Sequence, residues 1–140
     1  MSTERGRHRP LSSFVVRADA LGAGVAAVAF ARRWLDVVEV QGSSMAPTLV
    51  PGEWLLVERR SYSRRQPRVA EIVLAADPRE PDRELIKRVA AVDASSGTLD
   101  LRGDAPEAST DSRTFGAIPV EAVRWRVIAR YWPAARAARL

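Results

Sequence analysis

The feature that most restricts the fold of this 140-residue chain is a series of short runs rich in Val, Ile, Leu and Trp that begins after Asp36. Runs of this composition, closed by turn formers, are typical of β-strands. They cover residues 37–41, 53–59, 69–75, 84–93, 98–102 and 122–131. The breaks between them carry Pro51-Gly52, Pro78, Pro81, Ser95-Ser96-Gly97 and Gly103-Asp104. We therefore expect a mostly β fold over residues 36–140, built as a small barrel or a folded sheet of antiparallel hairpins.

Residues 1–35 differ in character, with a polar and basic tail followed by a weakly apolar segment that favours a helix. The apolar centre of that segment, residues 20–31, contains only twelve uncharged residues. Because about 20 are needed to span a bilayer, we expect no membrane span. A secretory signal peptide is not favoured either, since the segment runs directly into Arg32 and Arg33. We expect a helix that docks or touches a membrane surface, and a domain boundary at residue 36.

Few side chains are available for catalysis in this chain. Cysteine is absent, which excludes disulfides, thiolate zinc sites and cysteine nucleophiles. The single histidine, His8, lies in the basic tail, so neither a Ser-His-Asp triad nor a histidine metal site is expected. We therefore expect no metal ion and no other cofactor.

Arginine supplies almost all of the positive charge, because Lys87 is the only lysine among the 22 Lys and Arg residues. A net charge of +5 would suit an anionic partner such as nucleic acid. However, the one dense basic run, residues 59–68, contains the Ser, Gln and Pro that are typical of a solvated loop. We expect no nucleic-acid binding, and a non-catalytic basic β module remains an alternative. Burial can lower the pKa of a lysine but leaves arginine charged, which makes Lys87 a candidate base.

Two segments hold side chains that could act together. In residues 41–49, Ser44 lies where a strand runs into a Gly-Ser-Ser break, and a serine on such a turn is exposed as nucleophiles often are. A plain loop with turn-stabilising serines is the alternative. In residues 85–89, strand alternation puts Lys87 between apolar neighbours on one face, which lowers an ammonium pKa. An edge-strand lysine that discourages aggregation is the alternative there.

With no cysteine and no usable histidine, Lys87 is the best candidate base for Ser44, and the sequence predicts a serine-lysine dyad. A third segment, residues 103–113, is dense in turn formers and short polar side chains and by itself indicates only a loop.

The three segments, in this order, resemble the type I signal peptidase family. Residues 42–49 are similar to its nucleophile box, residues 87–89 to its general-base box and residues 103–116 to its last box. The resemblance covers residues 37–132 and implies a signal-peptidase-like fold with an N-terminal helix. It also implies a serine endopeptidase that acts on a precursor protein.

The resemblance implies a role for each matching residue. Ser44 corresponds to the nucleophile, Lys87 to the general base, and Ser109 to the hydroxyl that orients the lysine ammonium. Gly42 and Ser43 are supporting residues, and Gly42 stands where other members carry a second serine hydroxyl for the oxyanion. We expect Asp104, Asp111 and Arg113 to hold the last loop together. Asp111 and Arg113 should do so as an ion pair.

Within the family, residues 111–116 and 130–133 are most similar to the nickel superoxide dismutase maturation proteases. That likeness implies a cytoplasmic enzyme, with or without peripheral membrane contact, that removes an N-terminal extension from the dismutase precursor and needs no metal itself. A general type I signal peptidase that cleaves exported preproteins is the alternative. A self-cleaving repressor-type protein is not favoured, because residues 1–36 cannot supply a helix-turn-helix.

Overall fold

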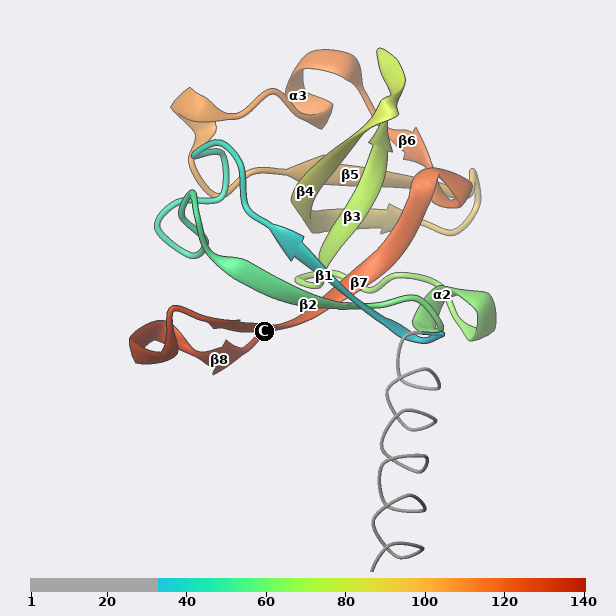
Figure 1. The fold of residues 1–140 in the computed structure, drawn as a ribbon. Coiled ribbons are helices and arrows are strands. Elements are labelled where there is room, and N and C mark those ends of the chain that lie inside the picture. The colour runs from blue at the N-terminus through green and yellow to red at the C-terminus, as the bar shows by residue number, and fades with distance from the viewer. Residues whose placement is uncertain (1–32) are drawn as a thin grey trace, which may run out of the picture. The chain divides into compact units, whose positions relative to one another are not determined.

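The apolar runs form an eight-stranded antiparallel sheet in the computed structural model, which describes residues 33–140 (Figure 1). The strands are β1 (Leu35–Glu39), β2 (Trp54–Glu58), β3 (Ile72–Asp77), β4 (Glu80–Asp93), β5 (Thr98–Arg102), β6 (Ile118–Pro119), β7 (Val123–Trp132) and β8 (Ala138–Arg139). Their order across the sheet is β1-β2-β7-β3-β4-β5-β6, and β8 pairs with β7. The prediction of a mostly β fold is confirmed.

Short helices connect the strands and lie at their ends. They are α2 (Ser61–Arg64), η1 (Pro106–Ala108), α3 (Ser112–Phe115), η2 (Val120–Ala122) and η3 (Ala134–Arg136). Among residues 33–140, none of the helices is long and apolar enough to cross a membrane.

The expectations for the N-terminal segment fall mainly outside the described residues. His8, the basic tail and the apolar residues up to position 32 all belong to the part that is not described. At the other end of that segment, the expected helix does not reach residue 35. Arg33 and Trp34 form a turn, and Leu35 already pairs with Glu58 in the antiparallel ladder.

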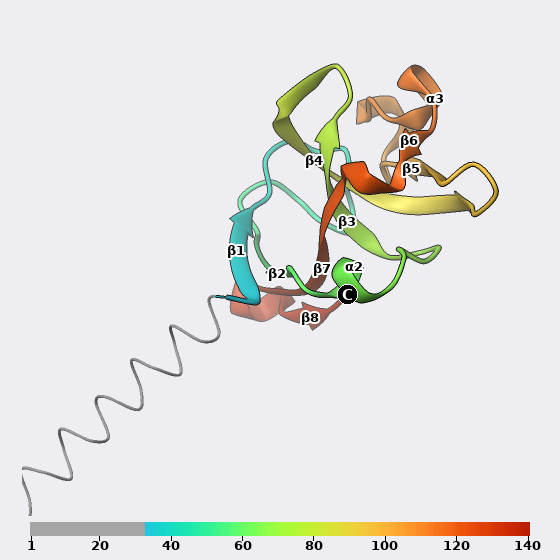
Figure 2. The ribbon, with the colours of Figure 1, turned by 90° about the vertical axis from the view of Figure 1, so that its right-hand side faces the viewer.

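Strand β3 is the centre of the domain because both of its faces are buried. Ile72 and Leu74 belong to one apolar cluster, which also contains residues from β2 and β7. Val73 and Ala75 belong to a second cluster, with residues from β4 and β5. In the side view, β3 lies between β1 on one side and β5 on the other (Figure 2). Each fully buried aliphatic side chain contributes about 1.5 to 3 kcal/mol, so this strand anchors both halves of the sheet.

The β3–β4 hairpin corrects one expectation, because Pro81 lies inside β4 rather than at a break. In the ladder with β3, Glu80 pairs with Asp77 and Glu84 pairs with Ala76, so residues 81–83 form a bulge. A bulge leaves residues outside the ladder, and a proline is tolerated there. Strand β5 pairs with β4 only from Arg88 onward. Within the described chain, the second edge of residues 80–87 therefore carries no strand.

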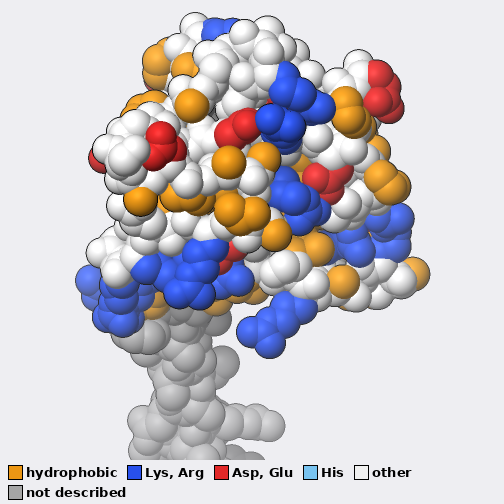
Figure 3. Space-filling view, turned by 180° about the vertical axis from the view of Figure 1, so that it is seen from behind, with side chains coloured by type: hydrophobic (Ala, Val, Ile, Leu, Met, Phe, Trp, Pro, Cys, Tyr) orange, Lys and Arg blue, Asp and Glu red, His pale blue; other side chains and the backbone are white. Residues whose placement is uncertain are grey.

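The basic run at residues 59–68 contains α2 instead of being a loop throughout. Three of its arginines contact other side chains: Arg59 pairs with Asp36 and stacks on Trp125, Arg60 stacks on Trp34, and Arg65 donates to Glu71. On the rear face, basic side chains lie in several separate places, and acidic side chains lie beside some of them (Figure 3). Much of the positive charge in this run thus contacts acidic or aromatic side chains of the same domain.

Candidate active site

The loop between β1 and β2, residues 40–53, carries the candidate nucleophile Ser44, and we call it the nucleophile loop. Apolar side chains anchor it. Met45 and Leu49 are buried in the first cluster, and the Leu49 N–H donates to the Met45 carbonyl at 2.9 Å. Gly42 has a φ of 82°, a conformation in which a side chain is strained although the space around it is open. A second serine at position 42 would therefore be disfavoured by the backbone of this loop.

Lys87 reaches Ser44 from the middle of β4. Its Nζ lies 2.7 Å from Ser44 Oγ. The lysine is only 4% exposed, and its same-face neighbours Leu85 and Val89 are also buried, as strand alternation predicts. Burial lowers the pKa of Lys87, and because a neutral amine has a lone pair, the Ser44 hydroxyl can then donate its proton to Nζ.

Charged groups around Lys87 act on its pKa in both directions after burial, which is the largest cause. The negative charge of Asp111 raises the pKa of Lys87, whereas the positive charges of Arg83, Arg113 and Arg79 lower it further. The net direction is downward, toward the range in which an amine serves as a general base.

Ser44 and Lys87 both line a cleft of about 330 Å³. The cleft lies between the β1 end of the nucleophile loop and the free edge of β4. Its lining residues are Val38 to Met45, Leu74, Arg79, Arg83 to Lys87, Ala108 and Thr110. Ser43 lines this cleft too, and its carbonyl accepts from the Ala46 N–H at 3.1 Å. An extended peptide could therefore lie along the cleft beside both reactive groups.

Asp104 joins the three sequence segments. Its carboxylate accepts two hydrogen bonds from Arg88, at 2.9 and 2.7 Å, and one from the Thr48 hydroxyl at 2.6 Å. Thr48 belongs to the loop of Ser44, and Arg88 follows Lys87 in β4. The hydrogen bonds from Arg88, above all, hold the pKa of Asp104 below its usual range. This ionised carboxylate thus fixes the loop that carries Ser44 to the strand that carries Lys87.

Asp111 organises the last segment and is fully buried. Arg113 donates to it from its guanidinium and its N–H, so the two residues form the ion pair that the sequence leads us to expect. The Gly103 N–H also donates, at 2.8 Å. Burial alone would raise the pKa of Asp111, but the hydrogen bonds from Arg113, Ser109 and Gly103 outweigh it and hold the pKa well below the usual range.

Ser109 donates its hydroxyl to Asp111 Oδ2 at 2.6 Å, and no hydrogen bond joins it to Lys87 among the described residues. A Cβ at position 103 would overlap the Ser109 side chain and the Ser44 carbonyl, so only glycine lets these segments approach so closely. Ser109 therefore lies near the dyad and contacts Asp111, which acts electrostatically on Lys87. Its role in orienting Lys87 stays a prediction.

Sequence reasoning assigned no role to three residues that hold the far side of the nucleophile loop: Glu53, Arg130 and Arg136. Glu53 is 1% exposed and is paired with both arginines. The only local signal was an acidic residue at the start of an apolar run. Nothing in the sequence indicated that arginines 77 and 83 residues later would meet it.

A folded antiparallel sheet whose cleft holds a serine hydroxyl against a buried lysine amine is typical of serine hydrolases in which lysine replaces histidine as the base. The comparisons with known proteins agree. A family model described as signal peptidase, peptidase S26, matches residues 15–96. The chain belongs to this family, and family membership makes it a serine protease.

Individual relatives show where the similarity lies. The chain is 31% identical to the mitochondrial ATP-independent inner membrane protease subunit 1a of Arabidopsis thaliana. The 120 aligned residues cover 71% of each chain. It is 34% identical to subunit 1b of the same organism over 66% of this chain and 67% of that one. It is 32% identical to signal peptidase I of Aquifex aeolicus over 48% of this chain and 27% of that one. These names support the family and carry no indication of a dismutase precursor.

Proposed function

We propose that the chain is a serine endopeptidase that uses Ser44 and Lys87 to remove an N-terminal extension from a precursor protein. The observation that carries this proposal is the 2.7 Å contact between Lys87 Nζ and Ser44 Oγ, two residues that line the cleft. A buried amine with a lowered pKa, in reach of a hydroxyl, meets the geometric and the protonation requirement for a general base.

The reaction follows from these two groups. Neutral Lys87 takes the Ser44 proton while Oγ attacks the scissile carbonyl, and the Ser44 backbone N–H stabilises the oxyanion. Collapse breaks the C–N bond, the lysine ammonium protonates the leaving amine, and an ester acyl-enzyme remains. Lys87 then deprotonates a water molecule that hydrolyses the ester and returns a proton to Ser44. One oxyanion donor of this kind is worth about 3 to 4 kcal/mol of barrier.

The substrate would enter as an extended strand. β1 is an edge strand, and residues 80–87 of β4 have one edge without a partner in the described chain. Both line the cleft, through Val38 to Gln41 and Arg83 to Lys87. Peptide backbone can add to such edges by hydrogen bonding, which places a scissile bond beside Ser44. A flexible N-terminal extension is a segment that can adopt this conformation.

We propose the nickel superoxide dismutase precursor as the specific substrate, on the likeness of residues 111–116 and 130–133 to the maturation proteases. On this proposal the enzyme acts in the cytoplasm. The second candidate is a general signal peptidase that cleaves exported preproteins, which the similarity to signal peptidase I of Aquifex aeolicus favours.

The test is to incubate the full chain with each purified precursor and to determine the mass and the N-terminus of the products. We expect one precise cut in the dismutase precursor, abolished by Ser44→Ala and retained by Ser96→Ala, a serine in the exposed β4–β5 turn. Cleavage of only the exported preprotein would favour the second candidate. Equal cleavage by wild type and Ser44→Ala would refute the proposed chemistry.

A further inference from the structure

A buried carboxylate closes the nucleophile loop on the side away from the cleft. Glu53, 1% exposed, accepts from the Val50 N–H at 2.9 Å, so it bonds the backbone of its own loop. The Arg136 Nε donates to it at 2.5 Å, and an Arg130 guanidinium nitrogen lies 3.5 Å from it. An unpaired buried carboxylate would be costly, so these two arginines supply the ion-pair partners that Glu53 needs at this place.

The same two guanidinium groups also bond the carbonyls of the loop. Arg130 donates to the Thr48 carbonyl at 2.5 Å, and Arg136 reaches the carbonyls of Pro47 and Thr48 at 3.2 and 3.4 Å. The Arg130 Nε–H also donates to the Arg136 carbonyl at 2.5 Å, which joins the two arginines to each other. Pro47 and Thr48 follow Ser44 closely in the chain, so these hydrogen bonds restrain the backbone next to Ser44.

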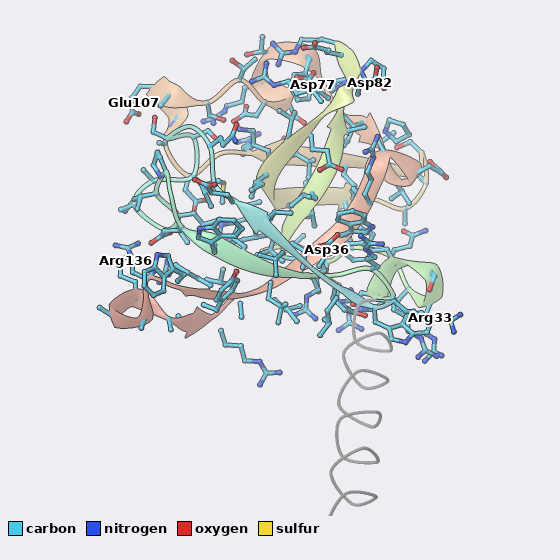
Figure 4. The ribbon with its side chains drawn as sticks, viewed as in Figure 1. Arg33, Asp36, Asp77, Asp82, Glu107 and Arg136 are labelled. Carbon is cyan, nitrogen blue, oxygen red and sulfur yellow. The ribbon has the colours of Figure 1, made fainter. Side chains whose placement is uncertain are left out.

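Arg136 comes from η3, in the C-terminal hairpin that joins β7 to β8, and Figure 4 labels it beside the nucleophile loop. Neither Arg130 nor Arg136 lines the cleft. Arginine suits this position because its planar fork donates to several acceptors at once, whereas a lysine ammonium is a compact charge on a flexible stem. Through these two arginines the C-terminal hairpin contacts the loop without lining the cleft.

We propose that Arg130 and Arg136 form a clamp, together with Glu53, that positions the nucleophile loop so that Ser44 meets Lys87. The clamp makes the C-terminal hairpin part of the catalytic apparatus as a positioning element. The loop is also held by Asp104 through the Thr48 hydroxyl and by the Ala105 N–H, which donates to the Ser44 carbonyl. The clamp adds a separate restraint through the carbonyls of Pro47 and Thr48. This inference rests on the proposed function only for its effect on rate.

The first test needs no substrate. Hydrogen exchange is measured on the full chain for wild type, Arg136→Gln and Arg139→Gln. Arg139 is the matched control, since it lies in the same hairpin, is exposed and has no side-chain partner among the described residues. We expect faster exchange over residues 45–52 in Arg136→Gln alone, with exchange in β3 unchanged. Wild-type exchange of the loop in Arg136→Gln, or an equal change in Arg139→Gln, would overturn the clamp.

The second test measures rate on the precursor that wild type cleaves. Small misplacement of a reacting group can cost up to about 100-fold, so we expect Arg136→Gln to lower kcat by about 10- to 100-fold with KM within about twofold. Arg136→Lys should recover only part of kcat, because an ammonium cannot bond Glu53 and both carbonyls in the same geometry. A loss confined to KM, or full kcat in either variant, contradicts a positioning role.

The two proposals fail separately. If Ser44→Ala cleaves as well as wild type, the proposed chemistry is wrong, and hydrogen exchange still decides whether the clamp holds the loop. If Arg136→Gln does not fold, Arg136→Lys takes its place, and wild-type loop exchange together with full kcat in that variant refutes the clamp.

Discussion

Replacing Asp111 by asparagine tests whether the last segment is held together by one ionised carboxylate. The Asp111 carboxylate acts only as an acceptor of hydrogen bonds. Oδ2 accepts from the Gly103 N–H, the Ser109 hydroxyl and the Arg113 guanidinium, and Oδ1 accepts from the Arg113 N–H and Nε. In asparagine one of the two oxygens becomes an NH₂ group, so at least two donors would face another donor.

The expected cost is large because Asp111 is fully buried. Arg113 is 34% exposed, so water screens part of the lost ion pair, but leaving a buried donor without an acceptor costs about 1 to 3 kcal/mol and at least two donors lose theirs. We therefore expect a total loss of about 3 to 5 kcal/mol. In a domain of this size that corresponds to a fall in melting temperature of roughly 10 to 20 °C. The control is Asp100→Asn, because the Asp100–Arg102 pair is 27% and 50% exposed and should contribute at most about 1 kcal/mol.

The pH dependence of the stability independently tests whether the ionised Asp111 carboxylate stabilises the fold. The pKa of Asp111 in the folded protein is lower than in the unfolded chain, where it is about 3.9. The carboxylate therefore stabilises the fold fully above that pH, and the stabilisation is lost as the pH falls through the folded pKa. Unfolding in urea at pH 7 and at successively lower pH should show the gap between wild type and Asp111→Asn narrowing below about pH 4.

Two results would refute this reasoning. One is a loss of stability in Asp111→Asn no larger than in Asp100→Asn. The other is a gap that stays constant into strong acid. A related effect should appear in catalysis: the Asp111 charge raises the pKa of Lys87, so its removal should move the acid limb of the rate profile to lower pH.

Three further predictions concern the dyad and the N-terminal segment. Lys87→Arg should show no cleavage although the side chain stays cationic, because a guanidinium cannot accept the serine proton, and measurable turnover in a peptide assay would exclude lysine as the base. The wild-type rate should rise with pH as Lys87 loses its proton and be unchanged by His8→Gln; a limb near pH 6.5 that vanishes in that variant would show that the base is misassigned. The chain should leave membranes at high salt, and deletion of residues 1–30 should leave a cleaving domain; material that only detergent extracts would indicate a spanning segment.

The strand pattern was readable from the sequence because burial on a sheet imposes an alternation that short apolar runs preserve. β5 was predicted at its observed bounds, and the placement of Lys87 between Leu85 and Val89 follows from a period of two. Pro81 was misread, because a proline, which has no N–H, breaks a strand only where the ladder needs an N–H at its position, and the bulge removes that need. Pairing register depends on the partner strand, which local sequence does not contain.

For the site, the sequence by itself determined which chemistry to propose: with no cysteine and a single histidine in the basic tail, a serine and the single lysine were the pair that it offered. What only the tertiary structure decided is how that pair is brought together and held. The 2.7 Å contact between Ser44 and Lys87 joins residues 43 apart, and the contacts of Asp104 with Thr48 and of Glu53 with Arg136 join residues 56 and 83 apart. Such contacts form because buried charges must find partners once the sheet has folded, and which partners they find depends on distances in space that no local pattern encodes.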